Sequence, residues 1–257
     1  MKLLIYSDLH TEITSFSIPK ERLELADVVI LAGDIGVGKQ AATWIQKNVS
    51  ETEVLWVWGN HEFYAGHIAA TRLKAAKALE ISPNIKILEN SSIEIEGVRF
   101  LGCTLWTDCK LRKGEVDTFR AIQEMSSRMN DYKYIRTGVG YRRLRVADTI
   151  GMHIRSRNWL EEELEKEHSG PTVVITHHAP LKKCVNEAKA VDIYLDGAYA
   201  SDLSELIHQY QPHLWINGHT HRKIDLVEGN TRCVSNPLGY HSYGEQTGFD
   251  PICIIEV

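Results

Sequence analysis

Cysteine is scarce in this sequence and follows no ordered spacing. The five cysteines, at positions 103, 109, 184, 233 and 253, are an odd number, and none forms a Cys-x-x-Cys pair. This pattern argues against a disulfide framework and is typical of free thiols in a reducing compartment. We therefore expect a cytoplasmic protein.

Long apolar runs are also missing. No apolar stretch approaches the ~20 residues that a membrane-spanning helix needs. The opening residues, MKLLIYSDLH, reach charged side chains too soon for a signal peptide, so we expect no membrane partner. Repeats, low-complexity tracts and linkers rich in proline and glycine are absent as well. The 257 residues are enough for a sizeable core, and we expect one domain over 1–257.

The sequence has no overall excess of basic charge. Its formal net charge is −5, which argues against a protein that coats nucleic acid. The exception is segment 128–157, where eight basic residues face two acidic ones, so that this segment is +6 and the remainder is −11. Such a segment is either a solvated surface or a positively charged wall that meets an anionic substrate.

Short apolar runs recur along the chain and alternate with helical patterns. The runs 2–7, 27–33, 53–59, 172–176 and 213–217 are continuous, which is typical of strands covered on both faces. Helical spacing is found over 65–81, 150–167 and 199–210, and Glu-Gly turns predict antiparallel hairpins at 91–103 and 223–236. We therefore predict an α/β fold with a mixed sheet or a sandwich of two sheets and outer helices. Segment 106–149 has no clean period and is expected to form a lid or rim over one end of the sheets.

Side chains able to bind a metal follow all five apolar runs. In chain order these residues are Asp8 and His10, then Asp34, then Asn60 and His61, then His177 and His178, and finally His219 and His221. A single aspartate after a strand is usually a helix cap or a turn residue. Five such coincidences are harder to assign to turns, because the carboxyl ends of strands form the ligand-binding edge of an open α/β sheet. We interpret these residues as a metal site.

The donor types indicate the chemistry of that site. Carboxylates, imidazoles and an amide oxygen, without a thiolate, suit manganese, iron, zinc, nickel or cobalt better than a structural zinc site. Without His61 and one of the adjacent His177 and His178, seven donors remain, which exceed what one tetrahedral ion needs, so two ions that share a carboxylate explain the set. Ions ~3.5–4 Å apart are suited to in-line displacement at phosphorus.

The motifs DLH, GDI, GNHE, THH and GHTH, in this order, resemble those of the calcineurin-like metallophosphoesterase superfamily. They span residues 8 to 221, and the stretches GNHEFY and NPLGY are similar to a bacterial branch of small single-domain members. The resemblance implies a metallophosphoesterase-type β-sandwich of two mixed sheets flanked by helices. This fold agrees with the two predicted hairpins.

The resemblance also implies a role for each donor. One ion would be held by Asp8, His10 and His221, the second by Asn60, His177 and His219, and Asp34 would bridge them. The ions would be divalent or mixed-valence manganese, iron, zinc or nickel, and no other cofactor is expected. A hydroxide between them would attack phosphorus, and His61 would protonate the leaving oxygen. Because a strand alternates its side chains, only one of His177 and His178 should face the ions, and the Ala-Pro that follows favours His177.

The favoured function is metal-dependent hydrolysis of a small phosphomonoester or phosphodiester. A nuclease or nucleotide phosphodiesterase that uses segment 128–157 is the alternative. A non-catalytic scaffold is disfavoured because every donor and His61 are retained. Among the neighbouring residues, Glu62 is expected to have a structural role and His153 to lie on the surface. The sequence does not indicate an oligomeric state.

Overall fold

Two mixed β-sheets form the centre of the computed structural model, which describes residues 1–49, 51–112, 114–185 and 194–257. The first sheet has the order β13-β1-β2-β3-β4, and the second has the order β11-β12-β10-β9-β6-β5. In the first sheet the strands are β1 (Lys2–Tyr6), β2 (Val28–Ala32), β3 (Glu53–Val57), β4 (Ile85–Leu88) and β13 (Ile254–Glu256). In the second they are β5 (Ser91–Ile95), β6 (Val98–Cys103), β9 (Thr172–Thr176), β10 (Leu214–Ile216), β11 (Ile224–Glu228) and β12 (Thr231–Ser235).

Each sheet is parallel at its centre and antiparallel at an edge. Strands β1 to β4 pair in parallel, and so do β6, β9, β10 and β12. The two predicted hairpins are present as β5–β6 and β11–β12, while β13 pairs antiparallel with β1. The predicted fold class, two mixed sheets flanked by helices, is thus confirmed.

Among the described residues, buried apolar side chains form three clusters that correspond to the spaces between layers. Alternate residues of one strand enter different clusters, as in β1, where Leu3 and Ile5 face the second sheet and Leu4 and Tyr6 face the helices. In the second sheet, Val173 and Ile175 of β9 face the first sheet, while Val174 packs on the other side. Both faces of these strands are covered, which explains why their sequences are continuously apolar.

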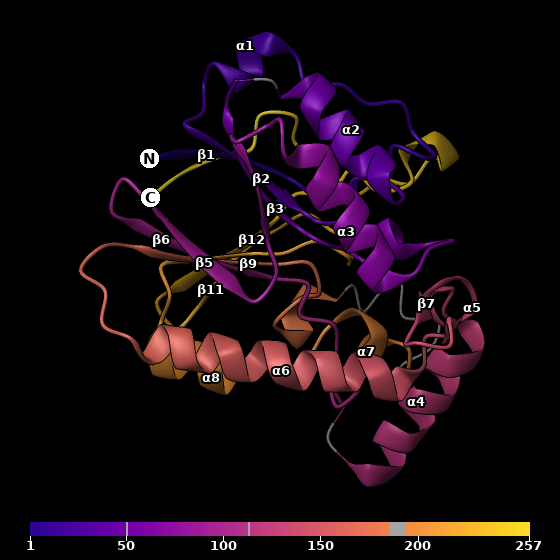
Figure 1. The fold of residues 1–257 in the computed structure, drawn as a ribbon. Coiled ribbons are helices and arrows are strands. Elements are labelled where there is room, and N and C mark those ends of the chain that lie inside the picture. The colour runs from indigo at the N-terminus through magenta and orange to yellow at the C-terminus, as the bar shows by residue number, and fades with distance from the viewer. Residues whose placement is uncertain (50, 113, 186–193) are drawn as a thin grey trace.

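Helices cover the outer face of each sheet (Figure 1). On the side of the first sheet lie α1 (Lys20–Leu23), α2 (Lys39–Asn48) and α3 (Ile68–Leu79), and on the side of the second lie α6 (Val146–Glu165) and α8 (Ser204–Tyr210). The helices predicted at 65–81 and 150–167 correspond to α3 and α6. The helix predicted over 199–210 corresponds to α8 but begins later than predicted, because α7 (Asp196–Tyr199) ends first and residues 200–203 are not helical. Ala200 continues extended, and Ala179 forms an isolated parallel bridge with it.

Segment 106–149 contains regular structure that its sequence did not reveal. It holds α4 (Glu115–Arg128), α5 (Asp131–Tyr134) and the short pair β7 (Arg136–Thr137) and β8 (Arg142–Arg143). These elements lie together at one end of the molecule in Figure 1. Short 3₁₀ helices, η1 (His61–Phe63), η2 (Lys182–Cys184) and η4 (His241–Tyr243), complete the named elements. Within the described ranges, no helix is both long and apolar enough to span a bilayer.

Candidate metal centre

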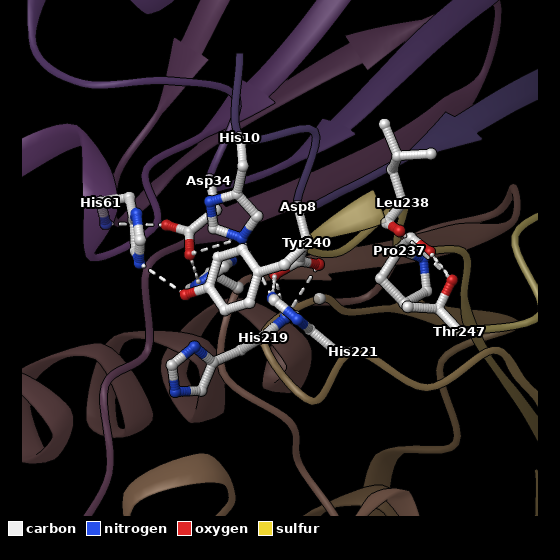
Figure 2. A network of polar contacts seen from close by, with 12 residues as sticks. Asp8, His10, Asp34, His61, His219, His221, Pro237, Leu238, Tyr240 and Thr247 are labelled. Carbon is white, nitrogen blue, oxygen red and sulfur yellow. Dashed lines mark hydrogen bonds and ion pairs between the residues drawn. The ribbon is translucent and has the colours of Figure 1, made fainter. Parts of the chain in front are cut away.

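The predicted donors come together where the two sheets meet. Three overlapping groups have potential ligand atoms within 4.8 Å of one another; the groups are Asp8, His10 and His221, then His10, Asp34 and His61, then Asp34, His177 and His219. Figure 2 shows Asp8, His10, Asp34 and His221 pointing toward one another beside the ring of Tyr240. Loops after β1, β2 and β3 supply Asp8, His10, Asp34 and Asn60, and loops after β9 and β10 supply the other histidines. The centre therefore exists only where the sheets are packed together.

Distances between the donors are short. The Nε2 atoms of His10 and His221 are 3.0 Å apart, and His221 Nε2 lies 3.5 Å from Asp8 Oδ1. On the other side, His177 Nε2 lies 3.0 Å from Asn60 Oδ1 and 3.4 Å from Asp34 Oδ2. The same Asp34 oxygen is 3.9 Å from His10 Nε2, so this carboxylate lies between the two halves of the cluster.

The strand-end loops have an unusual backbone conformation. Positive φ angles are found at Asp8 (51°), His10 (43°), Asp34 (56°), His219 (69°) and His221 (47°). Aspartate and histidine tolerate this region better than most residues, and such strain is concentrated at functional sites. The turns direct consecutive donors toward one point after the strands have ended.

Close backbone packing explains two glycines of the motifs. A Cβ atom on Gly59 would lie 2.1 Å from Asp34 Oδ1, and one on Gly218 would lie 2.7 Å from the carbonyl oxygen of Ala32. Both approaches are far inside van der Waals contact, so only glycine lets these loops come together around Asp34. Gly218, which follows the LWIN run, is thus required for the close packing of the two sheets.

Each clustered histidine uses one ring nitrogen for a hydrogen bond to the protein. The Nδ1 atoms of His10, His177 and His221 lie 3.3 Å from Glu12 Oε1, 2.9 Å from the Ala32 carbonyl and 2.7 Å from Glu245 Oε2, respectively. His219 instead uses Nε2, 3.3 Å from the Ala198 carbonyl. Hydrogen bonds of this kind fix the orientation and tautomer of a ligating imidazole.

The buried charges of the cluster favour a cation among them. Burial opposes ionisation of Asp34, yet His177 and His61 hold the pKa of this carboxyl well below its usual range. Burial also favours a neutral ring at His177, but Asp34 raises its pKa to about 9. The pKa of His219 falls to about 3 through burial and the nearby His177. The carboxylates therefore favour positive charge in the cluster, carried by a proton or by a metal ion.

His61 lies at the edge of the cluster and is only 8% exposed. Its backbone N–H donates to Asp34 Oδ1 at 2.8 Å, and its Nε2 lies 3.3 Å from the hydroxyl of Tyr240 (Figure 2). Its Nδ1 lies 2.9 Å from Glu12 Oε1. Burial lowers the pKa of His61, but Asp34 and Glu12 outweigh it and raise the pKa above the ordinary value. Nε2 is the nitrogen left facing the residues that line the cavity.

Glu62 joins the loops that carry the donors. Its carboxylate accepts three backbone N–H groups, from Asp34 at 3.1 Å, Ile35 at 2.7 Å and Gly59 at 2.8 Å. Burial and the charge of Asp34 raise its pKa to about 8. The structural role expected for Glu62 is therefore what the structure shows.

His177 and His178 point in different directions, as strand alternation predicts. The ring of His178 lies against Trp106 and His219, and its Nδ1 is 3.2 Å from the Thr104 carbonyl, so His177 alone belongs to a metal-competent group with Asp34. The surface position predicted for His153 is wrong, because this residue is 1% exposed. It shares a buried stripe of α6 with Thr149, Ser156 and Leu160, which follows helical spacing.

Four residues around the centre were not identified from the sequence: Glu12, Asp131, Tyr240 and Glu245. Glu12 had a weak signal, a carboxylate two positions after His10. The others come from segments with no metal-binding pattern and reach the site only through the fold. Asp131 is the most deeply buried of the four carboxyl and hydroxyl groups, at 3% exposure, and accepts hydrogen bonds from Asn60 and Tyr64.

A cavity of about 530 Å³ opens beside the cluster. Four of the donors, Asp34, Asn60, His219 and His221, line it together with His61. The other lining residues are Tyr64, Arg128, Met129, Asn130, Val185, Leu195, Asp196, Tyr199, Thr220, Tyr240 and Glu245. Three of them, at 128 to 130, belong to segment 106–149, so this segment contributes to the wall of the cavity. The volume suits a small molecule rather than a macromolecule.

A match to a protein-family model shows which family the chain belongs to. The model described as calcineurin-like phosphoesterase matches residues 1–223. The chain belongs to the calcineurin-like phosphoesterase family. The phosphoesterase is therefore a hydrolase of a family that uses divalent metal ions, and its structure contains groups of residues able to hold them.

The chain is also similar to one viral protein in sequence and to solved structures in fold. An uncharacterised protein of Acanthamoeba polyphaga mimivirus is 27% identical over 285 residues, with 100% of the phosphoesterase chain and 97% of the viral protein covered. The phosphopantetheinyl hydrolase of Mycobacterium tuberculosis has a similar structure, with a TM-score of 0.65, 16% identity and 93% and 89% of the two chains covered. A putative 5′-nucleotidase of Staphylococcus aureus has a TM-score of 0.52 and 13% identity, with 91% of this chain and 48% of that chain covered. At these identities the two solved structures establish the shared fold.

Proposed function

We propose that this chain hydrolyses a small phosphate ester at a centre of two divalent transition-metal ions. Membership of the family supports metal-dependent phosphoester hydrolysis. Imidazole, carboxylate and amide oxygen ligands suit manganese, iron, zinc or nickel, and availability contributes to the choice among them. The volume of the cavity supports a substrate of modest size.

The close approach of two histidine ring nitrogens is the observation that carries this proposal. When Nδ1 of His10 and of His221 donates to Glu12 and Glu245, each Nε2 keeps only a lone pair. These two Nε2 atoms nevertheless lie 3.0 Å apart. Two facing lone pairs repel each other unless a proton or a metal ion lies between them, so the arrangement fits a bound cation.

The ligand assignment is the one that the family resemblance implies, and it agrees with two of the groups whose ligand atoms lie within 4.8 Å of one another. We assign Asp8, His10 and His221 to one ion, Asn60, His177 and His219 to the other, and Asp34 to both. His219 would bind through Nδ1, because its Nε2 is used by the Ala198 carbonyl. When bound, the two ions would supply a water nucleophile of lowered pKa and stabilise the charge on the transferring phosphoryl group.

His61 is positioned to act on the leaving group. Its Nδ1 is engaged by Glu12, so its Nε2 is the atom available in the cavity wall. Tyr64 stacks on the ring with a centroid separation of 4.2 Å and an interplanar angle of 26°, which restricts its rotation. We propose that Nε2 donates a proton to the departing oxygen of the substrate.

Removal and return of metal tests the proposed function. We expect chelator-stripped protein to hydrolyse neither bis(p-nitrophenyl) phosphate nor p-nitrophenyl phosphate, and added Mn²⁺ to restore turnover of at least one. The ratio of the two rates would identify the ester class to screen. Turnover that is unaffected by chelation would contradict a metal mechanism. Two bound ions without turnover of any ester would favour a non-catalytic scaffold.

A nucleic-acid substrate is the second candidate, since Arg142, Arg143 and Arg145 are exposed and Arg128 of the same segment lines the cavity. Pairing reduces the available charge, because Arg142 donates to Asp148 at 2.6 and 2.8 Å. The small cavity also favours the first proposal.

Combined replacement of these three arginines by alanine distinguishes a polymer from a small ester. If the substrate is a nucleic acid, we expect weaker binding of a single-stranded oligonucleotide. The slope of its salt dependence should fall by about 2, which is about 0.7 for each of three lost phosphate contacts. KM for the small ester should stay unchanged. Fluorescence anisotropy over a salt series measures the first effect, and an equal change for both ligands would argue against polymer binding.

A further inference from the structure

A carboxylate from outside the metal-binding motifs contacts the centre. Asp131 is the first residue of α5 and lies 71 positions from Asn60 in the sequence, yet its side chain is almost completely buried beside it. Its Oδ1 accepts a hydrogen bond from Asn60 Nδ2 at 2.8 Å and another from the Tyr64 hydroxyl at 2.9 Å. The proposed ligand set does not include this carboxylate, and the structure shows no direct hydrogen bond between it and the His61 ring among the described contacts.

The contact decides which way the Asn60 amide points. An amide has a donor end and an acceptor end, and rotation about its last bond exchanges them. A carboxylate oxygen at Nδ2 favours the orientation in which nitrogen faces Asp131. The amide oxygen then faces the cluster, where it lies 3.0 Å from His177 Nε2. Without Asp131, either end of the amide could face the ion.

We propose that Asp131 is a positioning residue that holds the amide oxygen of Asn60 toward the second metal ion. The inference rests on the proposed function, because it takes Asn60 as a metal ligand. Residues that orient ligands in this way influence the affinity for the metal without touching it. Segment 106–149 thereby contributes to the metal centre as well as to the wall of the cavity.

The same carboxylate also holds Tyr64, whose ring stacks on His61. This second contact offers a matched control. Replacement of Tyr64 by phenylalanine removes its hydrogen bond to Asp131 and the long one, 3.4 Å, that the Tyr64 hydroxyl accepts from Asn60 Nδ2. It leaves the shorter contact of 2.8 Å between Asn60 Nδ2 and Asp131 in place. A role of Asp131 in anchoring Tyr64 would be weakened by that change, whereas a role in orienting Asn60 would be retained.

A double-mutant cycle on metal binding tests the proposal. The full chain is prepared as wild type, Asp131→Ala, Asn60→Ala, the double variant and Tyr64→Phe, and each is stripped of metal and titrated with Mn²⁺. We expect Asp131→Ala and Asn60→Ala each to weaken binding of the second ion about 10- to 100-fold. In the Asn60→Ala background, removal of Asp131 should have no further effect, because its partner is already lost. Tyr64→Phe should bind both ions nearly as wild type does.

Two further measurements separate positioning from a loss of structure. The Co²⁺-substituted proteins are compared by visible absorption, which reports the ligands around the ion and should change in Asp131→Ala but not in Tyr64→Phe. Turnover of a p-nitrophenyl ester at increasing Mn²⁺ should bring kcat of Asp131→Ala back toward wild type, since excess metal compensates for weak binding. A misfolded variant would not recover in this way.

Each outcome decides the question. Wild-type Mn²⁺ binding by Asp131→Ala, while Asn60→Ala binds one ion poorly, would overturn the positioning role and leave the proposed function intact. Wild-type binding of two ions by Asn60→Ala would overturn the ligand assignment and the positioning role with it. If metal-free Asp131→Ala does not fold, Asp131→Asn takes its place in the cycle. Its weaker acceptor should reduce binding in the same direction, and unchanged binding and spectrum would overturn the proposal.

Discussion

Replacement of Asp34 by asparagine is expected to lower kcat/KM by about 10³-fold or more. Asp34 belongs to two of the metal-competent groups, one with His10 and one with His177. Loss of its charge would therefore weaken the binding of both proposed ions. Stabilisation of transition-state charge by such ions contributes several kcal/mol, and each 1.36 kcal/mol changes a rate tenfold.

The asparagine variant is suited to this test because it preserves the shape of the site. Its side-chain oxygen can still accept the hydrogen bond that Asp34 Oδ1 receives from the His61 backbone N–H. The metal content, measured by mass spectrometry, should fall below that of wild type. Asp148→Asn, which removes a surface carboxylate paired with Arg142, serves as the control and should keep both metal and activity. A fully loaded and active Asp34→Asn protein would rule out the proposed shared ligand.

Replacement of His61 by alanine is expected to reduce kcat about 10²- to 10⁴-fold for an ester with a poor leaving group. A proton donor matters most when the departing oxygen is a strong base. For a p-nitrophenyl ester, whose phenolate leaves without help, the same substitution should have a much smaller effect. Measuring kcat for a methyl and a p-nitrophenyl ester of the same phosphate class gives this comparison.

An equal loss for both esters would contradict the role of His61 as a proton donor. It would indicate that His61 organises the cluster, since it also forms a metal-competent group with His10 and Asp34. Metal content measured on the same samples separates the two roles, because a proton donor can be lost without loss of ions. Turnover retained for both esters would exclude any part for His61 in the reaction.

The arrangement of the strands and of the predicted donors could be derived from the sequence because it depends on local patterns. Continuous apolar runs indicate strands buried on both faces, and parallel strands bring their carboxyl ends to one edge. Asp8 after β1 and Asp34 after β2 are therefore neighbours. His177 and His178 are consecutive residues directly after β9, and the expectation that their side chains diverge likewise needs no knowledge of the fold.

The residues that support the donors could not be derived in this way. Glu12 contacts His61 across 49 positions, and Asp131 contacts Asn60 across 71, and neither contact leaves a trace in local spacing. His153 was misplaced for a related reason. A polar residue on an amphipathic helix looks exposed until the loop that covers it is known, and here the Trp106 carbonyl lies 3.3 Å from its Nδ1.

The layer of apolar side chains between the two sheets separates the metal-binding residues of one sheet from those of the other. Leu3 and Ile30 on one sheet and Ile175 and Ile216 on the other belong to this layer, and the loops that follow their strands carry the donors. Its thickness therefore sets how far the donors of one sheet stand from those of the other. In a tightly packed interior, a change in side-chain volume of even one methylene group shifts the neighbouring residues. Substitutions deep in this layer would thus change the distance between the donors of the two sheets. A mutation introduced there to raise stability would therefore change the catalytic activity as well.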